Sequence, residues 1–195
     1  PINDFVESCI SKTGKDGIRQ LGLHGGYIDL NKYGIQAEST NPTDGNAFLF
    51  NPVDPKGGIV YWNYFKSDNT CEVDCQCGSE QPQLYKKDGS PNLETQLEDY
   101  IEENLETCLQ EFKAFEAQGF IIETPNKVKS QVNIRQDDVL LYVEYEVNVK
   151  KDKSEYKIEE FVEISPVQLR KMYEIANEIT QRELDYSYLE KWTVE

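Results

Sequence analysis

The sequence predicts an α+β protein in which an antiparallel β-meander sheet packs with about three helices. Apolar residues recur at helical spacing in three segments, at about 4–21, 92–116 and 166–190. Between the second and third segments, residues 120–164 alternate apolar and polar side chains and are interrupted by tight turns, which is typical of half-buried antiparallel strands. With 195 residues, of which 38% are hydrophobic, the chain is expected to form a single domain, 1–195, with its own core.

The first half of the chain contains one helix and a long segment rich in glycine, proline and asparagine. Asn3 or Asp4 is the expected N-cap of helix 4–21, Gly14 and Gly17 are expected to weaken it, and glycines near 22–26 are expected to end it. Short strands are expected at 27–30, 47–50 and 59–65, where β-branched and aromatic residues gather.

The second half carries the longest helix and the meander. Asn92 or Ser90 can cap helix 92–116, whose carboxylates are expected on the solvated face. Strands are expected at 120–123, 128–134, 139–149 and 156–164. Ser165 as N-cap, followed by Pro166, predicts the start of the last helix. Its apolar stripe comprises Leu169, Met172, Ala176 and Ile179.

Two of the five cysteines, Cys9 and Cys108, lie on the apolar faces of predicted helices. Packing these helices side by side would bring the two residues within disulfide range, so we expect this bridge. The alternative is a pair of buried free thiols. A disulfide indicates an oxidising compartment.

The other three cysteines, Cys71, Cys75 and Cys77, fall within seven residues. The favoured interpretation is a loop disulfide, Cys71–Cys75 or Cys71–Cys77, with one thiol left over. The alternative is a metal site that uses all three, for which His24, the only histidine, would be a distant fourth ligand. No cofactor is expected.

Charge and motifs exclude several classes of function. The net charge is −16, and the chain lacks the clustered Lys and Arg that bind phosphates, so nucleic acid is not an expected partner. No apolar run approaches the roughly 20 residues of a bilayer span, so this chain itself is not expected to contact the membrane. Catalytic and phosphate-binding motifs are absent, and acidic residues are too numerous to single out a catalytic pair.

An aromatic cluster is the strongest candidate ligand-binding feature. Tyr61, Trp62 and Tyr64 could present their rings to a sugar or a protein partner. Packing in the core is the alternative, and for these residues it is the favoured one.

Four segments together resemble a group of uncharacterised archaeal proteins of unknown function: Phe5–Cys9, Leu21–Ile28, Leu97–Leu105 with Cys108, and Phe115–Phe120. Members of that group carry an N-terminal membrane anchor and an extracytoplasmic domain. The resemblance therefore implies a cell-surface domain whose anchor precedes Pro1, with more chain after Glu195. It also implies no catalytic role for His24, because that position is often Gln in the group.

The leading hypothesis is accordingly a non-enzymatic interaction or structural domain of a membrane-anchored cell-surface protein, with a protein or a surface glycan as partner. One alternative is a surface hydrolase that acts on glycans or peptides. A second alternative is a pilin-like filament subunit.

Overall fold

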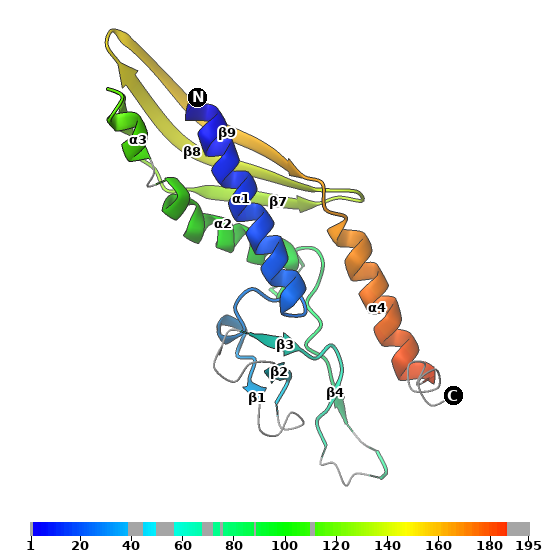
Figure 1. Ribbon diagram of the computed structural model, residues 1–195. Coiled ribbons are helices and arrows are strands. Elements are labelled where there is room, and N and C mark those ends of the chain that lie inside the picture. Colours follow the sequence, from blue (N-terminus) through cyan, green and yellow to red (C-terminus); the bar gives the residue numbers. More distant parts are fainter. Residues whose placement is uncertain are drawn as a thin grey trace.

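The computed structural model describes residues 2–38, 45–49, 57–67, 72–74, 76–87, 89–109 and 112–186, which form the α+β fold that the sequence predicts (Figure 1). Their helices are α1 (Ile2–Leu23), α2 (Leu93–Leu109), α3 (Lys113–Glu116) and α4 (Leu169–Tyr186), with a 3-10 turn η1 (Asn31–Tyr33). Their strands are β1 (Ala37–Glu38), β2 (Ala47–Leu49), β3 (Gly58–Val60), β4 (Tyr64–Phe65), β5 (Cys77–Gly78), β6 (Ile121–Glu123), β7 (Lys129–Ile134), β8 (Val139–Lys151) and β9 (Ser154–Ser165).

The meander is organised around β8, which pairs antiparallel with three strands. β9 follows one edge of β8 along almost its full length, while β7 and β6 share the other edge. Side chains of β8 alternate regularly between buried and less buried positions, as the sequence pattern predicts. The β8–β9 register shifts by one residue between Glu144 and Val147, which marks a bulge.

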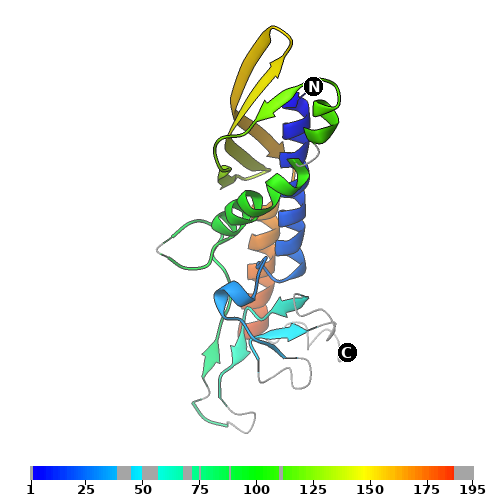
Figure 2. The same ribbon diagram turned by 90° about the vertical axis from the view of Figure 1, so that its left-hand side faces the viewer.

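Helices α1 and α2 cover one face of this sheet and pack against each other (Figures 1 and 2). The core between them contains side chains that are almost fully buried, including Ile10, Leu97, Ile101, Leu141 and Val143. It is the main hydrophobic core of the described residues.

Two glycines allow α1 to approach its neighbours closely. A Cβ added at Gly14 would collide with the Leu141 side chain of β8, and one at Gly17 would lie 2.9 Å from Cδ1 of Tyr100 in α2. α1 runs without interruption through both positions. The loss of helix propensity at each glycine is offset by packing.

The acidic face of α2 closes the free edge of β7. Glutamates at four-residue spacing accept hydrogen bonds from the backbone N–H groups of alternate strand residues: Ile134 to Glu94 (3.1 Å), Val132 to Glu98 (2.8 Å) and Ser130 to Glu102 (2.8 Å). Four residues of a helix advance about 6 Å and two residues of a strand advance about 6.6 Å, so each successive glutamate stays level with the next strand N–H that it accepts. The expectation that these carboxylates are merely solvated is wrong, because a sheet edge needs acceptors.

A second, smaller core lies beyond the C-terminal end of α1. Strands β1, β2 and β3 form a small sheet over Tyr27, Leu30, Ile35, Ala47 and Val60. We call this part, residues 27–60 as far as they are described, the small lobe; it lies below α1 and α2 in Figure 1.

Other expectations need correction. Residues 27–30 form no strand, because Gly25 and Gly26 turn the chain with φ of 69° and 94° and η1 follows. Segment 59–65 is divided between β3 and β4. Helix 92–116 ends at Leu109 and α3 begins at Lys113.

The last helix begins three residues later than predicted. Ser165 is not its N-cap, because its backbone still belongs to β9, where it pairs with Val139. By contrast, the expected cap of α2 is confirmed: Oδ1 of Asn92 accepts the N–H of Thr95 at 2.8 Å.

Candidate functional site

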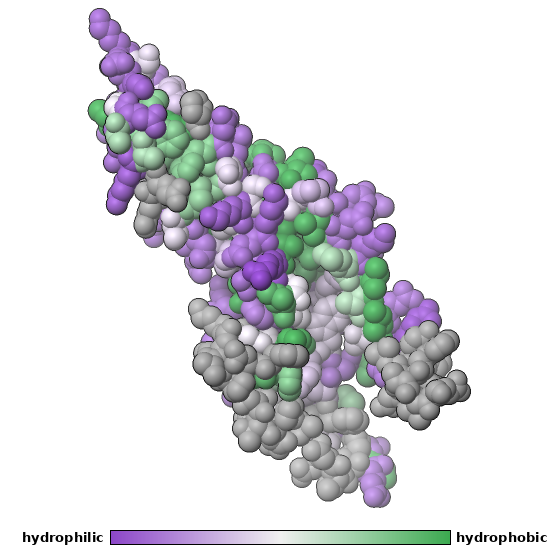
Figure 3. Space-filling model, in the orientation of Figure 1, coloured by the Kyte–Doolittle hydropathy of each residue, from purple (hydrophilic) through white to green (hydrophobic). Residues whose placement is uncertain are grey.

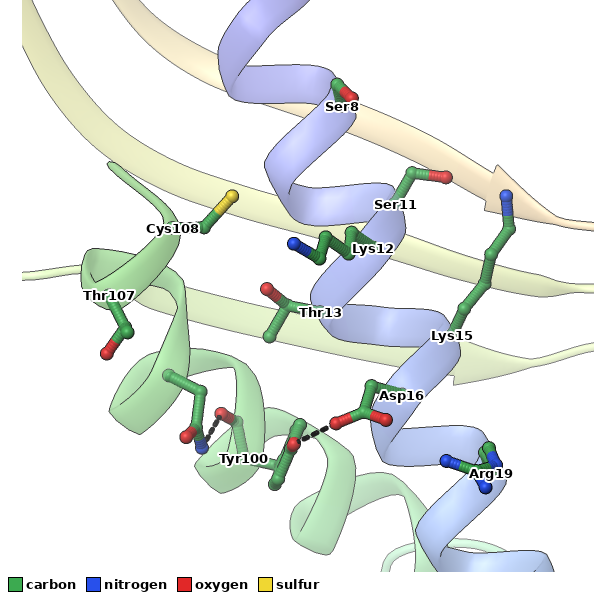
Figure 4. Close-up of a pocket in the computed structure, with 11 residues that line it drawn as sticks. Ser8, Ser11, Lys12, Thr13, Lys15, Asp16, Arg19, Tyr100, Thr107 and Cys108 are labelled. Atoms are coloured by element: carbon green, nitrogen blue, oxygen red, sulfur yellow. Dashed lines mark hydrogen bonds between the residues drawn. The ribbon is translucent and has the colours of Figure 1, made fainter. Parts of the chain in front are cut away.

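A groove of about 940 Å³ runs between α1 and α2 on the side away from the sheet (Figure 4). α1 and α2 both contribute to its lining, which consists of Ser8, Ser11, Lys12, Thr13, Lys15, Asp16, Arg19, Tyr100, Asn104, Thr107 and Cys108. Hydroxyl, amide and cationic groups dominate this set. The groove can therefore donate many hydrogen bonds to a ligand.

Three cations, Lys12, Lys15 and Arg19, occur on one exposed face of α1. Spacings of three and four residues place them on consecutive turns. No carboxylate among the described residues forms an ion pair with any of them. We call these three residues the basic stripe. It concentrates positive charge on a chain whose net charge is −16.

Among the described residues that line the groove, Asp16 is the only acidic one, and it is held by Tyr100. The Tyr100 hydroxyl donates to Oδ2 of Asp16, and Nδ2 of Asn104 donates to the Tyr100 carbonyl at 2.8 Å (Figure 4). Burial, together with the hydrogen bond and the negative charge of Asp16, raises the pKa of Tyr100 to about 12. The phenol therefore stays neutral and fixes the carboxylate at the wall of the groove.

The predicted bridge between Cys9 and Cys108 is present beside this groove. The two Cα atoms are 5.8 Å apart, and 99 residues separate the cysteines along the chain. Cys9 is buried in the main core. The disulfide fixes α1 against α2 and is consistent with an oxidising compartment.

A second unusual surface lies on α4. Met172, Ile175 and Ile179 are each about half exposed, at 51%, 50% and 50%, and their spacing puts them on one face. We call these residues the apolar stripe of α4. Figure 3 shows apolar surface along this helix.

α4 is joined to the rest of the protein through polar and aromatic contacts. The amide of Gln81 donates to the Tyr173 hydroxyl at 3.0 Å and to Oδ1 of Asn177 at 3.1 Å, and Tyr173 donates to the carbonyl of Pro82. These contacts use the side of the helix that bears Tyr173, so the apolar stripe stays uncovered by the described residues.

The aromatic candidates lie at or near the contact between α4 and the rest of the protein; they are Tyr61, Trp62 and Tyr64. Nε1 of Trp62 donates to the carbonyl of Gly25 at 2.8 Å, and its ring lies 5.3 Å from that of Tyr173. The Tyr64 hydroxyl donates to Glu80 at 2.8 Å. Tyr61 is partly buried, and burial raises its pKa. Their contacts serve structure, and whether any of them also binds a ligand stays a prediction.

The candidate metal ligands are not brought together within the part of the chain that is described. Cys71 and Cys75 lie outside the described residues, Cys77 has an exposed free thiol on β5, and His24 is buried at the end of α1. No group of three or more His, Cys, Asp or Glu side chains among the described residues is placed to hold a metal ion.

The sequence analysis predicts helix 4–21 but does not identify the basic stripe as a candidate site. The pattern that could have indicated it is the spacing of the three cations, at i, i+3 and i+7 of that helix. The expectation that this chain lacks clustered basic residues is wrong on this face, because three cations separated along the sequence meet on one side of a helix.

Comparisons with known proteins supply no family: no protein-family model, no curated protein and no solved structure matches the chain. Among the described residues, no helix has both the length and the apolar character that crossing a bilayer requires.

Proposed function

We propose that this protein is a non-catalytic, extracytoplasmic interaction domain of a cell-surface protein, and that α4 carries its contact surface. The observation behind this proposal is the apolar stripe. Met172, Ile175 and Ile179 are half exposed on one face of a helix that is already formed, so docking removes their apolar surface from water and requires little additional ordering of the backbone. The disulfide supports the placement in an oxidising compartment.

The charges beside the stripe fit a second copy of the same helix as the partner. Lys171 and Glu178 are seven residues apart and lie on the same flank of the stripe. When two copies of α4 pack antiparallel about a twofold axis near Ile175, the same flanks meet. Lys171 of each copy then lies opposite Glu178 of the other, and Met172 lies beside Ile179. Within its own helix Glu178 pairs with Arg182 at 2.8 Å, so in the dimer its carboxylate is shared between Arg182 and the Lys171 of the other copy.

This pairing is expected to be weak and reversible. Three half-exposed side chains and two exposed ion pairs form a surface smaller than the roughly 800 Å² per partner of a standard interface. Tethering two copies to one surface would raise their effective concentration and favour the dimer.

The experiment is sedimentation equilibrium of the oxidised protein, from micromolar to millimolar concentration. We expect the average mass to rise toward that of a dimer, and Ile175→Glu to abolish the rise. Ile121→Glu is the matched control, because Ile121 is 59% exposed on β6, away from α4.

A charge reversal tests the orientation. Lys171→Glu alone should weaken the dimer, and adding Glu178→Lys should restore it, because both cross-helix pairs are then reversed. A wild type that stays monomeric at every concentration, or an equal loss from Ile121→Glu, would contradict the proposal.

A further inference from the structure

We infer that the groove between α1 and α2 is a binding site for a compact, multiply charged oxyanion, such as a soluble molecule that carries phosphate or sulfate esters. The inference is independent of the proposed role of α4, because the groove and α4 share no residues.

Positive charge is the first part of the argument. The groove has three cations and one carboxylate, Asp16, among its lining side chains. Exposed charges are screened beyond about 8–10 Å at physiological salt, so a small ligand responds to this local excess more than to the net charge of −16. The negative charge elsewhere on the protein would still repel a long polyanion, which limits the ligand to a compact one.

Other roles do not account for the cations. Lys12 and Lys15 lie in the middle of α1, more than one turn from its C-terminal end, where the helix dipole falls off. The four-residue spacing of Lys12 and Asp16 allows an ion pair along the helix, but Asp16 instead accepts the hydroxyl of Tyr100. The cations are thereby left available to a ligand.

The shape of the groove defines the spacing of the ligand's charges. Helix geometry places the backbones of Lys12 and Lys15 about 4.5 Å apart along the axis and those of Lys12 and Arg19 about 10 Å apart. In Figure 4 Lys12 extends from α1 toward Cys108 of α2, whereas Lys15 extends on the side of α1 away from α2 and has to turn to reach the same ligand. A ligand with two or more anionic groups can contact Lys12 and span the stripe toward Arg19.

Neutral donors complete the site. Hydroxyls of Ser8, Ser11 and Thr107 line the same groove and can donate to ester or sugar oxygens. The disulfide and the close packing at Gly17 hold the two walls together, so little ordering is needed when a ligand binds.

Isothermal titration of the oxidised full chain with inorganic pyrophosphate tests the inference, with acetate as a singly charged comparison. We expect saturable binding of pyrophosphate that weakens steadily with salt and little binding of acetate. The triple variant Lys12→Gln, Lys15→Gln, Arg19→Gln should bind pyrophosphate at least about tenfold more weakly.

The matched control is Lys113→Gln, Lys127→Gln, Lys129→Gln, which removes the same charge from three exposed positions outside the groove. It should change the affinity by less than about twofold. Equal weakening in both triple variants, or no binding by the wild type, would overturn the inference. Binding to phosphatidylglycerol vesicles without binding to pyrophosphate would also overturn it, because the site would then recognise a membrane surface.

Discussion

The disulfide is expected to contribute several kilocalories per mole to stability, because it closes a very long loop. Cys9 and Cys108 are 99 residues apart, and the loop contains most of α1, the small lobe and nearly all of α2. In the chain-entropy model, a loop of this length lowers the entropy of the unfolded chain by about 16 cal/mol/K, which corresponds to about 4.7 kcal/mol at 25 °C. This exceeds half of the stability of a marginal domain.

Urea unfolding of the variant Cys9→Ala, Cys108→Ala measures this contribution, with both proteins carrying Ser in place of Cys71, Cys75 and Cys77 so that no other thiol can pair. We expect the free energy of unfolding to fall by about 4–5 kcal/mol, with a further small loss from the cavity at the buried Cys9. The slope against urea should rise, because an unfolded chain without the bridge exposes more surface.

A loss below about 1 kcal/mol would refute the reasoning, since the unfolded chain would then gain little freedom without the bridge. If the double variant does not fold, the fraction of bridged parent protein is measured at equilibrium with dithiothreitol, once without urea and once in urea that unfolds the chain; the difference between the two free energies of bridge formation gives the same contribution.

Three further predictions concern the helices. Glu98→Gln should lower the free energy of unfolding by about 1–3 kcal/mol, because the group that accepts the buried N–H of Val132 and pairs with Lys86 loses its charge. Exposed Glu103→Gln should change it by less than about 0.5 kcal/mol in the same urea assay. Gly14→Val should cost about 1–3 kcal/mol by thermal unfolding, because its side chain would displace Leu141; an unchanged melting temperature would contradict that close contact. Because the pKa of Tyr100 is higher in the folded protein than in the unfolded chain, its neutral phenol stabilises the folded state fully below pH 10, and this contribution should be lost as the pH rises through about 12. Ultraviolet titration of the wild type and of Tyr100→Phe should show that the tyrosine missing from the variant ionises near pH 12.

Much of the fold was predictable because most elements bury one face only. The alternation along β8 and the helical spacing of Leu97, Ile101 and Leu105 report directly on which side faces the core. The same reasoning correctly placed Cys9 and Cys108 on neighbouring helices. A core pattern is local in sequence, so it can be recognised without knowing the partner.

The remaining errors have a common physical origin in contacts between distant segments. A glutamate at every fourth position gives the same sequence pattern whether water or the edge of β7 donates hydrogen bonds to it. The sequence analysis therefore places Glu94 and Glu98 in solvent, although both accept N–H groups of β7. Ser165 suits both a helix cap and a strand end, and its pairing with Val139 decides between them. The sequence predicts that Leu169, Met172, Ala176 and Ile179 face the core, and Leu169 is buried. Farther along α4, however, Tyr173 is turned toward the protein, while Met172 and Ile179 are half exposed.

For the candidate site, chemistry was easier to predict than position. The sequence predicts that Trp62 either packs in the core or binds a ligand, but its contacts with Gly25 and Tyr173 require three segments to meet, and no local pattern shows them. The basic stripe could have been found by projecting the predicted helix 4–21 onto a wheel, since Lys12 and Arg19 need no distant partner to share a face.

The way in which the small lobe is attached has a consequence for how this fold can vary. The chain leaves α1 and later enters α2 at nearly the same place, where the side-chain amide of Gln96 receives the N–H of Ile28 at 3.0 Å and donates to the carbonyl of Gly26 at 2.9 Å. The chain between α1 and α2, residues 24–92, is therefore an excursion from a closed junction, and the small lobe is part of it. Changes of length in its exposed loops are expected to be tolerated, provided that the junction, the buried residues of the small lobe and the contacts of Gln81 and Trp62 with α4 are retained.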